Sequence, residues 1–247
     1  MNIFPVDRMK YEYQTLRETI IAAGENPDGF VIQQQQLRIH AELINNTTSY
    51  TFDLKTGNIT NYPLDVLLGQ NDRFFAYGLG LQIFKQDTST SPKQYGNAPR
   101  FTFPDPNYFV GTDTTNPEEW AALYALYNGN LNLKADVLTY STKLTTERFL
   151  YVPERTTQKQ ASPQINDEYP EYGTSMERRG IYYLGYQIPL SGQKENTGTL
   201  NLAAGNTAVI DGSWTSGGAQ TATTRNVVCL CIEGFLVVNA AAPIQKF

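Results

Sequence analysis

The sequence predicts an all-β protein, and three observations favour that class. The 247 residues include 16 Tyr, 12 Phe, 19 Gly and 13 Pro with only 17% charged residues, a composition that suits strands joined by turns. Two long apolar segments, Arg73–Lys85 and Asn226–Asn239, are typical of core strands. Polar clusters rich in Gly, Asn and Thr separate the apolar segments. A chain of this length can bury one generous core or two small ones.

The first predicted element is a helix over residues 5–23. Pro5 is tolerated in a first helical turn, and Gly24 follows the end as a stop signal. The apolar side chains of this helix share one stripe, formed by Met9, Tyr13, Leu16 and Ile20. The stripe requires a partner, which is this chain's own sheet, a neighbouring subunit or a membrane.

Strands are predicted next, over residues 30–44 and 49–54. In the first, Leu37, Ile39 and Leu43 alternate with polar side chains, which predicts one solvent-facing or interfacial side. Polar turns at 45–48 and 55–58 follow the two strands and predict a meander of hairpins.

The meander leads into Arg73–Lys85, which at about 3.3 Å per residue spans roughly 40 Å. Strand alternation predicts that its large side chains form one apolar wall and its small residues form a nearly bare opposite face. The wall contains Phe75, Tyr77, Leu79, Leu81 and Ile83, and the bare face contains Ala76, Gly78 and Gly80. The bare face indicates close approach by another layer, such as a neighbouring sheet or barrel.

The second half begins with a polar excursion and another helix. Residues 86–116 are expected to be ordered, because they carry aromatic anchors at Phe101, Phe103, Tyr108 and Phe109. A helix is then predicted from the N-cap Asn116 to Gly129, with Pro117, Glu118 and Glu119 in its first turn.

The remaining strands are predicted at residues 130–144 as one long strand, at 181–190, and at 226–239. Three segments connect them: a turn at Thr145 and Thr146, a polar loop over 154–179, and short strands with Gly/Thr-rich loops over 197–224.

Both halves share one plan of helix, long strand, Thr-Thr turn, strand and long closing strand. The plan predicts two tandem jelly-roll barrels with short helices, divided as residues 1–115 and 116–247. About twelve strand candidates are present, whereas two complete jelly rolls need about sixteen. A single elaborated jelly roll therefore remains the alternative.

Charge and N-terminal composition narrow the classes of function. The net charge is −5 and no Lys/Arg cluster could neutralise several phosphates, so sequence-specific or general nucleic-acid binding is not expected. The start MNIFPVDRMKYEYQ carries charges where a signal peptide needs an apolar region, and no apolar run approaches about 18 residues. The sequence predicts neither signal-peptide export nor a membrane-spanning segment.

Enzyme chemistry has little support in the sequence, and we expect no catalytic, cofactor-binding or metal residues. His40 is flanked by Arg38 and Glu42 on one strand face, which could supply a general base with an orienting carboxylate. No GxSxG, HExxH, P-loop or GxGxxG motif accompanies it. The prediction is a protein that is not an enzyme.

Metal binding is considered at two places. Cys229 and Cys231 lie two apart on one strand, so they point the same way and are predicted to be buried free thiols; a metal pair would need further ligands, and His40 lies far away in sequence. Loop carboxylates could hold Ca²⁺ at subunit contacts, although solvated loop acids are the favoured interpretation. These carboxylates are Asp105, Asp113, Asp167, Glu168 and Glu171.

The paired plans and the strands FFAYGLGLQIF (74–84) and VVCLCIEGFLVV (227–238) carry a resemblance at the level of pattern over most of the chain. The sequence resembles the double jelly-roll major capsid proteins of tailless icosahedral bacteriophages. The resemblance implies a structural virion protein that assembles in the host cytoplasm, without a cofactor. It also implies homotrimeric, pseudo-hexagonal capsomers, contacts with other virion proteins, and an N-terminal helix that faces any internal membrane.

A carbohydrate-binding or adhesin-type β-sandwich is the alternative from a different class. Aromatic side chains on loops could stack on sugars, as in lectin jelly rolls. The candidates are Tyr108, Tyr169, Tyr172 and Trp214. The same residues could instead anchor their own loops or become buried at subunit contacts.

Overall fold

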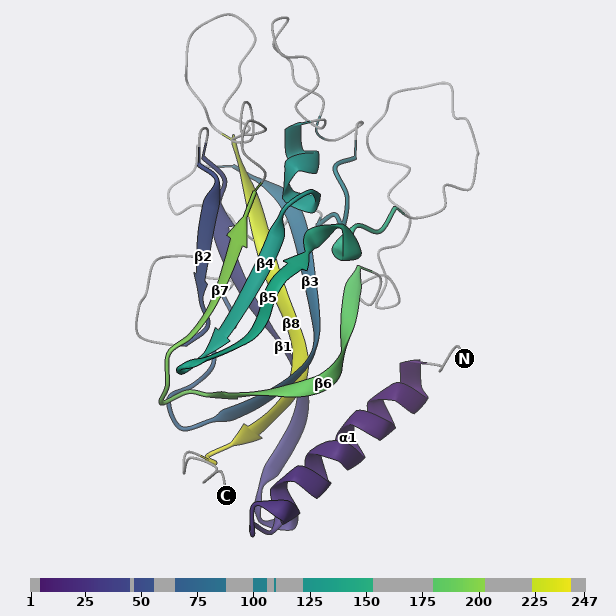
Figure 1. The fold of residues 1–247 in the computed structure, drawn as a ribbon, viewed down its shortest axis with the longest axis vertical. Coiled ribbons are helices and arrows are strands. Elements are labelled where there is room, and N and C mark those ends of the chain that lie inside the picture. Colours follow the sequence, from purple (N-terminus) through teal and green to yellow (C-terminus); the bar gives the residue numbers. More distant parts are fainter. Residues whose placement is uncertain are drawn as a thin grey trace, which may run out of the picture.

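A computed structural model describes residues 5–44, 47–55, 65–87, 100–105, 109, 122–152, 180–202 and 224–240. Within this part of the chain, one α-helix precedes eight strands that form two four-stranded antiparallel sheets (Figure 1). The all-β prediction is therefore confirmed. The elements are α1 (Pro5–Ala22), β1 (Val31–Glu42), β2 (Ser49–Asp53), β3 (Arg73–Asp87), β4 (Asn130–Ala135), β5 (Leu138–Thr145), β6 (Ile181–Ser191), β7 (Asn196–Asn201) and β8 (Thr224–Val238), with 3₁₀ turns η1 (Pro27–Gly29), η2 (Tyr124–Tyr127) and η3 (Thr146–Phe149).

The strand order shows how the sheets are connected. The first sheet has the order β1-β8-β3-β6 and the second has the order β2-β7-β4-β5. Consecutive strands lie in opposite sheets except for the β4–β5 hairpin, so the predicted meander of hairpins is wrong. This order of eight strands in two sheets is that of one jelly roll.

Both sheets contain strands from the two predicted modules, and in the first sheet these strands are interleaved. Strand β8, from the second half of the chain, lies between β1 and β3 from the first half. The described strands therefore form a single jelly roll, and a double jelly roll is not confirmed. The predicted repeat rested on the succession of helix, strand and turn along the chain, which does not determine which strands pair.

Large apolar side chains fill the space between the two sheets. Phe52 from β2, Leu133 from β4 and Leu230 from β8 are each 0% exposed and belong to one continuous cluster. The sheets approach closely at Gly198, where an added Cβ would lie 2.7 Å from Leu230 Cδ2. Burial of each large side chain contributes about 1.5–3 kcal/mol, so this layer is the main source of stability.

The predicted long strand Arg73–Lys85 is confirmed as β3, but the predicted wall of side chains is wrong. The pairing with β8 shifts between Ala76 and Gly78, which leaves Tyr77 as the extra residue of a β-bulge. Before the bulge Phe75 points out of the sandwich, and after it Leu79 points in. One inserted residue reverses which side chains point inward and which point outward, so the large side chains of β3 are divided between the two faces of the sheet.

The predicted bare face is divided by the bulge: Ala76 faces the core between the sheets, while Gly78 and Gly80 lie on the outer face, where the neighbouring strand β6 covers them instead of the predicted sheet or barrel. An added Cβ on Gly78 would lie 2.8 Å from Ile181 Cγ2, and one on Gly80 would lie 2.6 Å from Ile181 Cδ1. Gly80 would also place its Cβ 2.8 Å from the carbonyl oxygen of Gly180. The two glycines thus admit the start of β6 against β3.

Helix α1 agrees with its predicted range, and of the three possible partners it packs on the chain's own sheet. Its buried residues Leu16 and Ile20 contact the outward-facing side chains of β3 and β8, among them Phe75 and Val237. Gly24 follows the helix with φ +79°, the left-handed conformation typical of a C-terminal stop. Across the described residues, no helix combines the length and the apolar character needed to cross a membrane.

Charged contacts hold both ends of α1 to the sheet. Arg8 pairs with Glu12 at 3.0 Å and donates to the carbonyl oxygen of Leu184 on β6 at 2.8 Å. Arg73 donates to both carboxylate oxygens of Glu25, at 3.0 and 2.9 Å, and to the carbonyl oxygen of Ala240. The helix is therefore fixed in position by named polar contacts as well as by its apolar stripe.

The predicted single strand over residues 130–144 is wrong, because the chain reverses at Asp136 and Val137. These two residues form the loop between β4 and β5, and Asp136 adopts φ 54°. Aspartate tolerates this left-handed conformation. The Asp-Val pair lacks the glycine that usually marks such a turn, which explains why the pattern predicted a continuous strand.

Most of the residues that lie between strands belong to connections at one end of the sandwich. The connections over 88–129, 146–180 and 202–223 are anchored there, because Asp87 at the end of β3 pairs with Thr224 at the start of β8, and Asn130 at the start of β4 pairs with Thr145 and Asn201 at the ends of β5 and β7. The opposite end has the short connections 136–137 and 192–195 and the longer connection 54–72 between β2 and β3. The predicted helix start, Asn116 to Glu119, and the predicted loop 154–179 lie outside the described residues.

Candidate functional site

A compact cluster of titratable side chains lies on the outer face of the first sheet. Strand β1 pairs with β8 so that His40 stands directly opposite Cys229. Cys231, two residues along β8, points to the same face, and its Sγ lies 3.7 Å from the Cys229 Sγ. The pairing register thus brings the chain's single histidine to its two cysteines.

Asp65 completes this cluster from the segment before β3. Its Oδ1 lies 2.5 Å from His40 Nδ1 and accepts a second hydrogen bond from the His40 backbone N–H at 3.1 Å. Arg100 covers the cysteines, with Nη1 3.5 Å from Cys229 Sγ and its guanidinium 5.2 Å from the centre of the Phe84 ring. The carboxylate predicted beside His40 was Glu42; the one that the fold supplies is Asp65.

The protonation states follow from burial and from these contacts. Burial disfavours a charged His40, but hydrogen bonds with Asp65 and Cys229 outweigh it and raise the His40 pKa. Burial likewise raises the pKa of the Cys229 thiol, but hydrogen bonds with Cys231 and His40 outweigh it and lower that pKa. The hydrogen bond with Cys229, followed by burial, raises the pKa of Cys231. These shifts favour a proton on His40 and make Cys229 the more acidic of the two thiols.

Cys229, His40 and Asp65 are the types of group that serve as nucleophile, base and orienting carboxylate. Cys229 and Cys231 are 0% exposed, and the His40 side chain is also 0% exposed. The sulfur atoms are closed to solvent in this arrangement, and the cluster forms a buried polar network between β1, β8 and the segment containing Asp65. The prediction of buried free thiols is confirmed.

The predicted calcium carboxylates can be located only in part. Asp105 lies in the described segment 100–105, whereas Asp113, Asp167, Glu168 and Glu171 lie outside the described residues. Within the described segments, no group of three or more His, Cys, Asp or Glu side chains is arranged to hold a metal ion. A calcium site at subunit contacts stays a prediction.

The predicted sugar-stacking aromatics Tyr108, Tyr169, Tyr172 and Trp214 all lie outside the described residues. The other anchors of the excursion, Phe101, Phe103 and Phe109, are buried between the sheets. Phe101 also exchanges backbone hydrogen bonds with Ile83 of β3, each 2.8 Å long. The described part of this segment therefore packs on the core, as its aromatic residues predicted.

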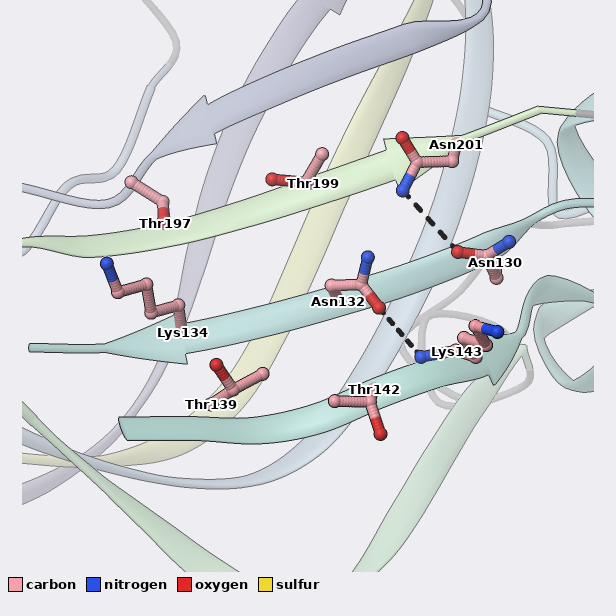
Figure 2. Close-up of a pocket in the computed structure, with 9 residues that line it drawn as sticks. All are labelled: Asn130, Asn132, Lys134, Thr139, Thr142, Lys143, Thr197, Thr199 and Asn201. Atoms are coloured by element: carbon pink, nitrogen blue, oxygen red, sulfur yellow. Dashed lines mark hydrogen bonds between the residues drawn. The ribbon is translucent and has the colours of Figure 1, made fainter. Parts of the chain in front are cut away.

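A shallow polar hollow lies on the outer face of the second sheet (Figure 2). The backbone N–H of Lys143 donates to Asn132 Oδ1 at 2.7 Å, and the Asn201 amide donates to Asn130 Oδ1 at 3.4 Å. All nine lining residues come from β4, β5 and β7 and carry polar side chains: Asn130, Asn132, Lys134, Thr139, Thr142, Lys143, Thr197, Thr199 and Asn201. This hollow can accept and donate hydrogen bonds but offers no aromatic side chain for stacking.

Comparison with known proteins adds no further constraint. No protein-family model matches the chain, and no curated protein sequence matches it significantly.

Proposed function

We propose that the protein is a structural virion subunit, a jelly-roll capsid protein that assembles with copies of itself into an icosahedral shell. The observation that carries the proposal is the strand order β1-β8-β3-β6 against β2-β7-β4-β5, an arrangement that viral capsid and lectin domains share. The homotrimeric capsomer, the icosahedral shell and the bacteriophage origin come from the sequence resemblance.

The packing of the sandwich supports a mechanical role. Phe52, Phe74 and Phe149 are 0% exposed in one apolar cluster that joins both sheets, so the interior is occupied by the chain's own side chains. A filled sandwich of long strands transmits load between its two ends, as a shell wall requires. The candidate functional surfaces are accordingly on the outside.

The distribution of chain length also fits a shell subunit. The three longest connections between strands, 88–129, 146–180 and 202–223, start and finish at one end of the sandwich, whereas the longest connection at the other end is 54–72. This unequal division of chain length distinguishes the two ends of the subunit, which suits a layer with an outer and an inner surface.

Electron microscopy of the purified full-length protein tests the proposal. We expect closed shells or regular capsomer assemblies, and sedimentation should show a trimer or a larger particle. A stable monomer at every accessible concentration would contradict the proposal.

A carbohydrate-binding module is the second candidate, and the polar hollow in Figure 2 is the observation that favours it. Its amides and hydroxyls could hydrogen-bond to sugar hydroxyl groups. A glycan-binding screen distinguishes the two: a monomer that binds a glycan and loses binding on Asn132→Ala or Thr199→Ala would favour this candidate over the capsid.

A further inference from the structure

Strand β1 is an edge of the first sheet, and half of it carries no neighbour in the described part of the chain. Arg38 exchanges backbone hydrogen bonds with Val66, which shows that the backbone groups of residue 38 point away from β8. Because these groups alternate in direction along an antiparallel strand, those of Ile32, Gln34 and Gln36 also point outward. Side-chain exposure agrees with an open edge here, since Val31 is 65% exposed and Gln34 is also exposed.

The other three edge strands carry features that discourage pairing, whereas this segment does not. Strand β2 has only five residues. Strand β5 contains Lys143 with φ 56° and has two shifts in its pairing, and β6 contains Pro189 and faces the bulge of β3. By contrast, β1 pairs with β8 without a shift, and Val31–Leu37 contains neither a charge nor a proline.

The open segment is complementary to a second copy of itself. Residues that face each other in an antiparallel pair point to the same side of the sheet. Even-numbered and odd-numbered residues of β1 point to opposite sides, so in one continuous sheet an even-numbered residue must face an even-numbered residue of the second copy, and an odd-numbered residue must face an odd-numbered one. Centring the pair on Gln34 places Gln34 opposite its own copy and Ile32 opposite Gln36. This register uses the outward groups of Ile32, Gln34 and Gln36 from both copies and stops at Arg38, where Val66 already pairs.

The side chains fit the same register. Gln33 would face Gln35 and Val31 would face Leu37, so these pairs match amide with amide and apolar with apolar; Ile32 would face Gln36, and no like-charge contact arises. An isologous contact of this kind generates a closed two-fold pair.

We propose that the open edge of β1, centred on Gln34, binds the same edge of a second copy of this chain to form one continuous eight-stranded sheet across a two-fold axis. The interaction does not depend on the virion role, because it rests on strand geometry alone.

A charge-swap experiment tests both the contact and its register. Gln34→Lys or Gln34→Glu would place identical charges opposite each other, and each variant alone should raise the dissociation constant of the pair roughly fivefold. An equimolar mixture should restore association, because Lys then faces Glu. Sedimentation velocity on the full-length chain measures all three samples.

Two control variants separate charge from loss of contacts. Gln34→Ala removes the amide at the centre of the contact and its hydrogen bond from Nε2 to the Tyr77 hydroxyl without adding charge, so it should weaken association less than Gln34→Lys or Gln34→Glu. Gln33→Lys adds the same charge opposite Gln35 and should weaken association less than Gln34→Lys. Equal association of every variant, or a mixture no stronger than either charged variant, would overturn the proposal.

Hydrogen exchange gives an independent measurement. Amides of Ile32, Gln34 and Gln36 should exchange slowly in the associated wild type and quickly after dilution, while those of Gln33 and Gln35 stay protected by β8 in both states. Fast exchange at the three outward amides in the associated state would reject the β1 contact. Closed shells seen together with that result would leave the proposed capsid function intact.

Discussion

His40 acquires its chemical environment from three separate parts of the chain. The strand pattern placed it between Arg38 and Glu42, but its ring contacts Asp65 and lies opposite Cys229. A histidine that is closed to solvent and still has a raised pKa depends on its partners, because burial alone would lower that pKa. The buried network therefore links pH to stability.

Asp65→Asn tests this link. The raised pKa means that the stabilisation from protonated His40 is fully present below its usual value near 6.5 and is lost as pH rises through the raised value. We expect the variant to lose about 2 kcal/mol of unfolding free energy near pH 6, and less at about pH 9. Denaturant unfolding at both pH values measures the difference.

Asp136→Asn is a matched control for that substitution. Asp136 forms an exposed ion pair with Lys194 at 3.3 Å, with 45% of its side chain exposed, so this change should have little effect on stability at either pH. Equal, pH-independent losses in both variants would contradict the proposed role of Asp65.

At the scale of single elements, the bulge in β3 determines whether each of its side chains points to the inner or the outer face of the first sheet. Tyr77 contacts Phe235 under α1, whereas Leu79 lies between the sheets. A strand without the bulge would direct both to one side. The two residues should therefore respond differently to the same substitution.

Leu79→Asp should prevent folding, because it buries a carboxylate among apolar side chains at a 0% exposed site. Tyr77→Asp should instead release α1 while the sandwich still forms. Circular dichroism and limited proteolysis distinguish these results, and a native-like, soluble Leu79→Asp protein would show that β3 is not part of the core.

The contribution of α1 can be measured separately. Leu16→Ala should cost about 2–4 kcal/mol of unfolding free energy, since Leu16 is 0% exposed against the sheet. Tyr11→Ala, on the opposite side of the helix and 62% exposed, should change stability little. Similar losses from both variants would argue that the helix does not pack through its predicted stripe.

For the whole molecule, the interleaved strands make the two halves of the chain interdependent. Strand β1 has only β8 as a full neighbour in the described sheet, and β3 lies between β8 and β6. The first half alone therefore lacks the partners of both long strands, and neither half contains a complete sheet.

A fragment of residues 1–115 should consequently remain unfolded in isolation, with no cooperative thermal transition. Co-expression with residues 116–247 should restore a complex of the two fragments. Cooperative folding of the first fragment alone would support two independent modules instead of the single interleaved jelly roll.

Much of the fold could be predicted from local patterns, with identifiable failures. The stripe of Leu16 and Ile20 and the stop at Gly24 predicted α1, and the apolar runs predicted β3 and β8. The Asp136 turn and the Tyr77 bulge were missed, because neither carries a distinctive local signal. Asp65 was missed as the partner of His40 because 25 residues separate the two.

The sequence by itself determined the all-β class, the amphipathic helix and the long strands, because side-chain periodicity and turn residues act over a few neighbouring positions. Only the tertiary structure decided that β8 inserts between β1 and β3, that His40 meets Cys229 and Asp65, and that the outer edge of β1 around Gln34 has no strand neighbour among the described residues. These features depend on pairing between segments far apart in the chain, and that pairing is selected by burial of the common core between the two sheets.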